Sequence, residues 1–450
     1  MLYTLLKPFS LFGLNIFYRI TIKGLDTLPK NVPVIFAPNH TNGFVDPVIL
    51  AMYSRKKVRF FARGDAFKGK FAKWLLNQMN VSPMYRLQEG YAEIKKNDQS
   101  FEECKRLLAE NKMILIFPEG ICIQERRLHT LKKGLSRIAF QTLEALNYEK
   151  DIYIVPVGIN YPAPTRFRSK VFIDIGEAIS IKAYESKYKE DKVRAINDFT
   201  KQLEIRMLEH VSHIGSSDND RLVANIEEVF THRLLIDKGL DPRKLKHHPI
   251  ASADIIAMVN VLSVEKPEFI SDIKSKLEKY IQLLITKNLR DHLFHEESIN
   301  KMNFGTFMLE YAIIYLGMPI YFIGLLMNYP PYYIGKIYAD KKIKKAEFYA
   351  SFRVNLSFIF WTVYFLLQML VFGAIFNSWL FQIIFGFSVI FSGVFVVKFY
   401  PMMKKIFGRW RLLRMVRKDR ETVEQLVNER GEIMNDLLLM KKEYDLLSKN

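Results

Sequence analysis

The chain has 450 residues, of which 49% are hydrophobic and 25% are charged, and its formal net charge is +19. This length accommodates one catalytic domain of ordinary size together with substantial further segments. The excess of positive charge indicates an anionic partner, either nucleic acid or a membrane surface that carries anionic lipids and phosphorylated substrates. Cys104 and Cys122 are the two cysteines, and this sparse usage fits a reducing compartment and gives no metal-ligand spacing.

Residues 1–19 are rich in leucine and phenylalanine, but Lys7, Pro8 and Arg19 interrupt them. The segment is too broken to cross a bilayer, and it lacks the basic start and cleavage site of a signal peptide. We therefore expect a helix that lies in the membrane interface. The side chains expected among the lipids are Phe9, Leu11, Phe12, Leu14, Ile16 and Phe17. Alternatively they cover the core of the next domain, and both could hold.

Residues 20–185 alternate short apolar runs with amphipathic segments. This pattern is typical of an α/β domain, a sheet with flanking helices. Strands are expected at 34–38, 58–62, 81–86, 113–120 with its polar turn, 152–158 and 170–176, and a helix at 101–110.

Within this domain, we expect the chemistry to depend on the segment 34–47. Its apolar run ends at Pro38, presents His40 and restarts at Asp46-Pro47, which predicts a buried strand, a loop and a helix. Asp46 could reach one ring nitrogen of His40 and leave the imidazole to act as a general base. Alternatively Asp46 is structural, because an aspartate directly before a proline suits a helix N-cap.

Three later segments follow His40 in a specific order. They are the run that ends at Arg86, the turn Phe117-Pro118-Glu119-Gly120, and the run that contains Val155-Pro156-Val157. With these four segments, residues 20–185 resemble the glycerolipid acyltransferases, the family that contains glycerol-3-phosphate and lysophosphatidate acyltransferases. The resemblance implies transfer of a fatty acyl group to a glycerol phosphate hydroxyl. The co-substrate would be a thioester of coenzyme A or acyl carrier protein, with no other cofactor.

Two departures from the family pattern bear on the acceptor. Five residues, Thr41 to Val45, separate His40 from Asp46 where four are usual, a spacing that resembles the yeast-type glycerol-3-phosphate and dihydroxyacetone-phosphate acyltransferases. Ile121-Cys122 follows Gly120 where the family often has an arginine. Cations that could replace that arginine are Arg126, Arg127, Lys132 and Lys133. Lys133-Gly134, at the expected start of a helix, most resembles the family pattern.

The resemblance gives each matched residue an expected role. The catalytic residues would be His40 and Asp46, and the substrate-binding residues would be Arg86, Phe117, Pro118, Glu119, Gly120 and Lys133. His40 would remove the proton of the attacking hydroxyl, an effect of about 10²–10⁴ in rate. The planar guanidinium of Arg86 would bind the phosphate, and a backbone N–H near Gly120 could bind the oxyanion. We expect glycerol-3-phosphate or dihydroxyacetone phosphate as the acceptor, with 1-acylglycerol-3-phosphate as the alternative.

Other functions compete with this interpretation. Cys122 could form an acyl-cysteine with the help of His40, which would make the chain a thioester hydrolase. The chain could also be an inactive membrane scaffold, although His40, Asp46, Arg86 and Glu119 are all present. Binding of nucleic acid is not expected, because the positive charge is concentrated beside apolar segments of membrane-spanning length.

Residues 186–305 are mostly helical and charged in pattern, and we expect a helical accessory region there. His292, His295 and Glu296 could share one helical face. They match no recognised ligand motif, and neither does the pair His247-His248, so we expect no metal site.

Residues 306–400 form an expected membrane-embedded region. The apolar stretches 354–376 and 379–397 each have about the 20 residues needed to cross a bilayer, which predicts a transmembrane hairpin. Basic residues flank it on both sides, beginning with Lys336, Lys341, Lys342, Lys344, Lys345 and Arg353 before it and Lys398, Lys404, Lys405, Arg409 and Arg411 after it. Because lysine and arginine concentrate on the cytoplasmic side, we expect an integral membrane protein with its catalytic domain on that face.

A third apolar stretch, 311–328, precedes the hairpin. Pro319 is expected to break it into half-helices and Pro330-Pro331 to close it, which gives a membrane-embedded segment that does not cross. Three crossings are the alternative.

Residues 401–450 comprise a basic segment and a terminal helix. Apolar residues recur there at alternating steps of three and four, and Arg430 interrupts them. A coiled coil that forms a homodimer would explain this spacing, although we favour an amphipathic helix that docks on the body of the protein or on the membrane.

Overall fold

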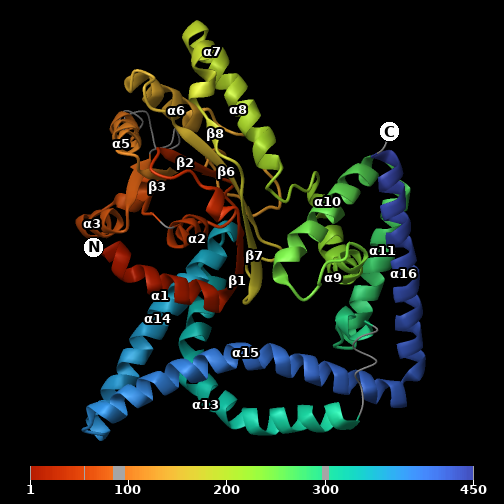
Figure 1. Cartoon of the computed structure of the whole chain (residues 1–450). Coiled ribbons are helices and arrows are strands. Elements are labelled where there is room, and N and C mark those ends of the chain that lie inside the picture. Colours follow the sequence, from red (N-terminus) through yellow and green to blue (C-terminus); the bar gives the residue numbers. More distant parts are fainter. Residues whose placement is uncertain (1, 55, 85–96, 296–303, 449–450) are drawn as a thin grey trace. The chain divides into compact units, whose positions relative to one another are not determined.

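The computed structural model describes residues 2–54, 56–84, 97–295 and 304–448 (Figure 1). The chain divides into two compact units. The first contains Met1–His213 together with Asp340–Val354, and the second contains Ile214–Ala339 together with Asn355–Asn450.

The first unit is built on an eight-stranded mixed sheet. The strands are β1 (Tyr18–Lys23), β2 (Val34–Pro38), β3 (Val58–Arg63), β4 (Val81–Met84), β5 (Met113–Leu115), β6 (Tyr153–Asn160), β7 (Ser169–Ile175) and β8 (Ile179–Ser180). Their order is β1-β7-β6-β2-β5-β3-β4, and β8 pairs with β6. The pairs of β6 with β7 and with β8 are antiparallel, and the other pairs are parallel. The predicted sheet with flanking helices is confirmed.

Helices cover both faces of this sheet. They are α1 (Leu2–Phe17), α2 (Val45–Tyr53), α3 (Lys70–Gln78), α5 (Asn97–Ala109), α6 (Gly134–Ala145), α7 (Glu185–Glu190) and α8 (Lys192–Leu208), with 3-10 turns at Leu25–Thr27, Gly64–Phe67 and Lys182–Tyr184. Ile35 and Ile114 of the central strands are fully buried in one cluster with Phe140 of α6 and Phe199 of α8. Burial on both faces explains why the central strands are continuous apolar runs in the sequence.

Helix α1 is amphipathic, which is compatible with both alternatives for residues 1–19, contact with the membrane interface and cover of the domain core. Leu14 and Phe17 are buried, and α1 lies beside α2, where the Tyr3 hydroxyl donates to Ala51 O at 2.7 Å (Figure 1). On the other face, Phe9 is 55% and Phe12 is 41% exposed. One face of α1 thus covers the core of the domain, and contact of the other face with a membrane stays a prediction.

The second unit contains a helical core. Its helices are α9 (Asp220–Asp237), α10 (His248–Glu265), α11 (Pro267–Thr286) and α16 (Arg420–Leu447), with 3-10 turns at Ser217–Asn219, Leu245–His247 and Asp291–Phe294. The apolar residues Leu426, Ile433, Leu437 and Met440 of α16 are buried in one cluster with residues of α9, α10 and α11. The terminal helix therefore docks on the body of its own chain, as favoured from the sequence, and a homodimer through it stays a prediction.

Three further helices are long and apolar enough to cross a membrane. They are α13 (Phe304–Lys342), α14 (Ala346–Ile375) and α15 (Trp379–Lys418). The rings of Phe372 and Phe385 stack with their centroids 4.1 Å apart, so α14 and α15 form the predicted helical hairpin. Helix α14 begins well before the apolar stretch 354–376, and α15 continues well beyond the stretch 379–397. The added parts are polar and continue the same helical backbone.

The prediction that prolines would divide the segment 311–328 is wrong. Helix α13 runs without a break through Pro319, Pro330 and Pro331, and Figure 1 shows that it is bent along its length. A proline removes one backbone hydrogen bond and bends a helix, but neighbouring helices can hold such a bent helix together. Asn328, for example, donates to Val389 O of α15 at 3.2 Å.

Candidate active site

His40 lies in the loop that joins β2 to α2, at the carboxyl end of a central strand, and Asp46 lies in the first turn of α2. The ring Nδ1 of His40 is 3.0 Å from Asp46 Oδ2. The same oxygen accepts the backbone N–H groups of Thr41 (2.9 Å) and Asn42 (2.7 Å), while Oδ1 accepts the Tyr161 hydroxyl at 2.7 Å. Asp46 is fully buried, and these four donors hold its carboxylate in one orientation.

The expected N-cap role of Asp46 is not observed. Helix α2 begins at Val45 with Phe44 in the cap position, so Asp46 lies in the first turn of the helix. Its carboxylate points back to the loop that precedes the helix, where it accepts the N–H groups of Thr41 and Asn42. Asp46 therefore organises the loop around His40.

This geometry decides which nitrogen of His40 is basic. A carboxylate only accepts hydrogen bonds, so the contact with Asp46 places the proton on Nδ1 and leaves Nε2 with its lone pair. The imidazole stacks on Phe117 with the ring centroids 3.7 Å apart, and its side chain is 12% exposed. His40 is thus fixed in orientation while part of it stays accessible.

Glu119 is a second buried carboxylate beside the loop. Its Oε1 accepts the backbone N–H of His40 at 2.9 Å, and its Oε2 accepts the backbone N–H of His129 at 3.1 Å. Burial raises the pKa of Glu119 to about 7, and the nearby charge of Asp46 acts in the same direction. The two oxygens therefore hold two backbone segments in place, one at His40 and one at His129. The role in acceptor binding expected for Glu119 stays a prediction.

The other residues of the 117–120 turn hold its backbone. Lys132 N donates to Pro118 O at 2.7 Å, and Gly120, at a φ of +67°, donates its own N–H to Phe117 O at 3.2 Å. A side chain at Gly120 would be strained at that φ, which accounts for the glycine. Because this N–H is occupied, the predicted oxyanion contact would fall to a neighbouring N–H.

The last of the four segments supports the loop from the adjacent strand. β6 pairs with β2 so that Pro156 lies beside Ala37 and Val157 beside Pro38. Just beyond these pairs, the Asn39 side chain donates to Ile159 O (3.1 Å) and accepts from Ile159 N (2.6 Å). These contacts fix the point at which the chain leaves the sheet towards His40.

Tyr161 is a site residue that the sequence analysis missed. It is buried directly after β6, and both burial and the charge of Asp46 hold the pKa of its hydroxyl far above the usual value. The hydroxyl is therefore a permanent donor to Asp46. Its place three residues after the end of the expected strand 152–158 was the available signal.

The cations expected to bind phosphate differ in where they lie. Arg86 lies outside the described residues. Lys133 is an exposed residue at the N-cap of α6, so the predicted helix start is observed. Lys132 lies closer to the turn, because its Cγ is 3.3 Å from where a β-carbon on Gly120 would stand. Binding of phosphate by any of these residues stays a prediction.

Cys122 lies near the same loop in a different electrostatic setting. Burial, followed by the charges of Asp46 and Glu347, raises the pKa of its thiol. A nucleophilic cysteine needs a lowered pKa, because the thiolate is the reactive form. The environment of Cys122 therefore favours a packing role over nucleophilic attack.

The histidines considered for a metal site are held by other contacts. His295 Nε2 is 3.1 Å from Asp291 Oδ2, and Arg430 binds the same carboxylate. Glu296 lies outside the described residues. Within the described ranges, no group of three His, Cys, Asp or Glu residues is arranged to hold a metal ion.

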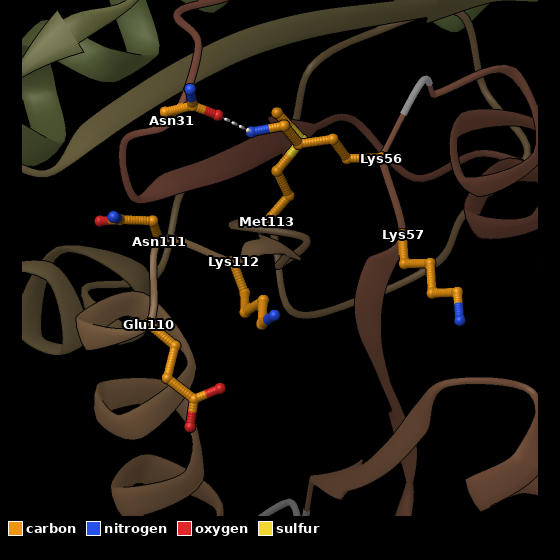
Figure 2. Close-up of a pocket in the computed structure, with 7 residues that line it drawn as sticks. All are labelled: Asn31, Lys56, Lys57, Glu110, Asn111, Lys112 and Met113. Atoms are coloured by element: carbon orange, nitrogen blue, oxygen red, sulfur yellow. Dashed lines mark hydrogen bonds between the residues drawn. The ribbon is translucent and has the colours of Figure 1, made fainter.

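A cavity of about 460 Å³ lies elsewhere on the first unit (Figure 2). It is lined by Asn31, Lys56, Lys57, Glu110, Asn111, Lys112 and Met113. These residues stand before or at the amino ends of β2, β3 and β5, whereas His40 follows the carboxyl end of β2. The cavity is therefore separate from the His40 loop, and Figure 2 shows Lys56 bonded across it to Asn31 Oδ1 at 3.0 Å.

The loop that carries His40 lies within a region that is similar to known proteins. Residues 19–160 match the family model described as Acyltransferase. The chain is 28% identical over 127 residues to the chloroplastic 1-acyl-sn-glycerol-3-phosphate acyltransferase LPAT1 of Arabidopsis thaliana, which covers 28% of this chain and 34% of that protein. It is 25% identical over 247 residues to glycerol-3-phosphate O-acyltransferase 1 of Saccharomyces cerevisiae, which covers 53% of this chain and 31% of that protein. The chain thus spans about a third of the length of these curated relatives.

Among solved structures, the chain is similar to the 1-acyl-sn-glycerophosphate acyltransferase PlsC from Thermotoga maritima. The identity is 21%, the TM-score is 0.31, and the match covers 44% of this chain and 78% of that one.

Proposed function

We propose that residues 19–160, which match the family model described as Acyltransferase, form a domain that transfers a fatty acyl group from a thioester donor to a hydroxyl of glycerol-3-phosphate in phospholipid biosynthesis. Dihydroxyacetone phosphate is an equivalent acceptor in this proposal. The observation that carries it is the contact of 3.0 Å between His40 Nδ1 and the buried Asp46 carboxylate, which leaves Nε2 as a base.

The reaction follows from this geometry. An alcohol is a weak nucleophile at neutral pH, and His40 Nε2 removes its proton as the oxygen attacks the thioester carbonyl. The new ester C–O bond forms, the C–S bond breaks, and the imidazolium returns the proton to the departing sulfur. Transfer is direct, so no acyl-enzyme is formed.

Asp46 contributes by stabilising the imidazolium formed during the attack. Its four donors keep the carboxylate in place before the reaction, so little reorganisation is needed when the positive charge appears. We expect the base to contribute about 10²–10⁴ to the rate.

Two observations support glycerol-3-phosphate as the acceptor. The five residues between His40 and Asp46 resemble the yeast-type spacing, and the match to the yeast glycerol-3-phosphate acyltransferase covers 53% of this chain. The similarity to the chloroplastic enzyme favours the second candidate, 1-acylglycerol-3-phosphate, with phosphatidate as the product. Arg86, Lys133 and the residues of the 117–120 turn would bind the phosphorylated acceptor in either case.

We place this reaction at a membrane surface. Helices α13, α14 and α15 are long and apolar enough to enter a bilayer, and the net charge of +19 suits anionic lipids. The acyl donor is a cytosolic thioester of coenzyme A or acyl carrier protein, so the proposal includes a catalytic domain on the cytoplasmic face.

The test is acyl transfer from a long-chain acyl-CoA by the detergent-purified chain, with glycerol-3-phosphate and 1-acylglycerol-3-phosphate compared side by side. His40→Ala should lower transfer by about 10²–10⁴. His247→Ala serves as the matched control, because that histidine lies in the second unit, where its ring Nδ1 contacts Asp241 O between α9 and α10. Transfer to neither acceptor would reject the proposed substrates, and full activity of His40→Ala would reject His40 as the base.

The same assay separates transfer from thioester hydrolysis. With Cys122→Ala, direct transfer should persist, because Cys122 takes no part in it. Loss of activity in this variant together with release of free fatty acid by the wild type would support a hydrolase instead.

A further inference from the structure

The catalytic loop contacts a segment more than 300 residues further along the chain. The first residues of α14 belong to the same compact unit as the sheet. Gly43 N donates to Glu347 O at 3.0 Å, and Phe44 N donates to the Ser351 hydroxyl at 3.0 Å. The Ser351 hydroxyl donates in turn to Asn42 Oδ1 at 2.7 Å. Both the donor and the acceptor capacity of this hydroxyl are thus used by the loop.

Packing makes this contact specific. Ser351 and Asn42 are both fully buried. A β-carbon on Gly43 would stand 2.6 Å from Phe348 Cδ1, so only glycine lets the loop and the helix approach this closely. Beside them, the Phe44 ring lies 5.6 Å from the Phe348 ring and 5.7 Å from the Phe352 ring, centroid to centroid.

Asn42 links this contact to the catalytic pair. Its backbone N–H donates to Asp46 Oδ2 at 2.7 Å, and its side-chain amide donates to the Tyr18 hydroxyl at 3.2 Å. Asp46 Oδ2 is the oxygen that also contacts His40. A displacement of Asn42 would therefore move a donor away from the carboxylate that orients the base.

We propose that Ser351 is a positioning residue for the acyl-transfer reaction, through which the first turns of the hairpin helix α14 hold the His40 loop in its active geometry. Ser351 lies far outside residues 19–160, the region that matches the family model. The inference rests on the proposed function, since it assigns Ser351 a role in that reaction. It makes the beginning of a membrane helix part of the catalytic domain.

The test compares Ser351→Ala with Ser357→Ala in the full-length purified protein. Ser357 is a matched control, because it is a buried serine of the same helix and its hydroxyl contacts Tyr332 O. Loss of a hydrogen bond that holds the loop should lower kcat by roughly tenfold in Ser351→Ala and leave KM for both substrates unchanged. Ser351→Thr retains the hydroxyl and should recover most of kcat.

Hydrogen exchange provides a readout that does not need activity. Peptides that cover residues 39–48 should exchange faster in Ser351→Ala than in the wild type and in Ser357→Ala, because Phe44 N loses its acceptor. If the wild type acylates neither acceptor, the proposed function fails while the exchange difference still reports the contact. Equal kcat and equal exchange in Ser351→Ala and Ser357→Ala would overturn the role of Ser351.

Discussion

Two buried carboxylates flank the backbone of His40, and they differ in what surrounds them. Asp46 accepts four hydrogen bonds, from His40, Thr41, Asn42 and Tyr161. Glu119 accepts two backbone N–H groups and is 1% exposed. Burial therefore dominates at Glu119 and raises its pKa from 4.5 to about 7. The loop is thus held on one side by a carboxylate that titrates near neutral pH.

This raised pKa predicts a pH-dependent contribution to stability. Below pH 4.5, Glu119 is protonated in the folded and the unfolded chain. Between pH 4.5 and about 7, the folded state keeps a proton that the unfolded state has released, so the free energy of unfolding falls as pH rises. The fall should be about 3 kcal/mol in total, and it should level off above pH 7.

Glu119→Gln should remove this dependence, because glutamine does not titrate. Thermal unfolding midpoints of the wild type and the variant are measured at pH 5 and pH 8. The unfolding midpoint of the wild type, relative to that of the variant, should be higher at pH 5 than at pH 8, because only the wild type loses stability as Glu119 ionises. Glu110→Gln, at an exposed position in the same unit, should show no such change. A difference between wild type and Glu119→Gln that is the same at both pH values would contradict the raised pKa.

At the scale of elements, strands β2 to β7 were predicted because their cause is local, whereas β1 and β8 were missed. The central strands are short apolar runs bounded by polar turns, and the sheet with flanking helices follows from that alternation. Likewise, the strand, loop and helix around His40 could be read from the segment 34–47. The predictions that failed concern local signals that neighbours override. Pro319 did not end α13, and Asp46 did not cap α2.

Contacts between distant segments could not be predicted in the same way. Tyr161 reaches Asp46 because β6 pairs with β2, and Ser351 reaches Asn42 across 309 residues. Neither residue belongs to a recognisable motif, and each acquires its role from strand order or helix docking. Arg430 is a third example. It appeared as an interruption of the apolar spacing in α16, and it is the ion-pair partner of the buried Asp291.

That ion pair joins α16 to the 3-10 turn at Asp291–Phe294. Arg430 Nε donates to Asp291 Oδ1 at 2.8 Å and Nη2 donates to Oδ2 at 3.3 Å, and Asp291 is fully buried. Burial acts to raise the pKa of Asp291, but the hydrogen bonds from His295 and Arg430 outweigh it and hold that pKa below the usual value. The folded unit therefore contains a buried charge that needs its partner.

Arg430→Ala should destabilise the second unit by about 3–5 kcal/mol, because the charge of Asp291 would stay buried without the guanidinium that pairs with it. Arg420→Ala is the matched control on the same helix. Its exposed pair with Glu424 should contribute little. The measurement is the denaturant midpoint of the helical signal for each variant. Equal midpoints for the two variants would show that α16 docks without the help of the ion pair.

At the scale of the whole molecule, the contacts of α14 constrain how α13 meets the membrane. In the parts of the chain that the structure describes, the first helix able to span a bilayer is α13. The segments 85–96 and 296–303 are shorter than the roughly 20 residues that a crossing helix needs. Residues up to His295 should therefore share one side of the membrane with the catalytic domain. Asp340–Val354 shares that side, because it belongs to the catalytic unit.

Helix α13 therefore begins and ends on the same side, which a single straight crossing does not allow. The contact of α13 with α15 indicates how deep α13 reaches into the membrane. Asn328 donates to Val389 O, ten residues after the start of α15 at Trp379. Ten helical residues rise about 15 Å, half of a hydrocarbon core of about 30 Å. Pro330 and Pro331 follow directly, and α13 is bent along its length (Figure 1). We therefore predict a re-entrant helix that turns back near the bilayer midplane.

Labelling of single cysteines in sealed vesicles tests this topology. In a background with Cys104 and Cys122 replaced by alanine, the variants are Lys279→Cys before α13, Lys342→Cys at its end and Asn377→Cys at the tip of the hairpin. All three positions are exposed. A re-entrant α13 predicts that a membrane-impermeant maleimide labels positions 279 and 342 from the same side and position 377 from the other. Labelling of positions 279 and 342 from opposite sides would establish that α13 crosses, and it would separate Ser351 from the His40 loop by the thickness of the membrane.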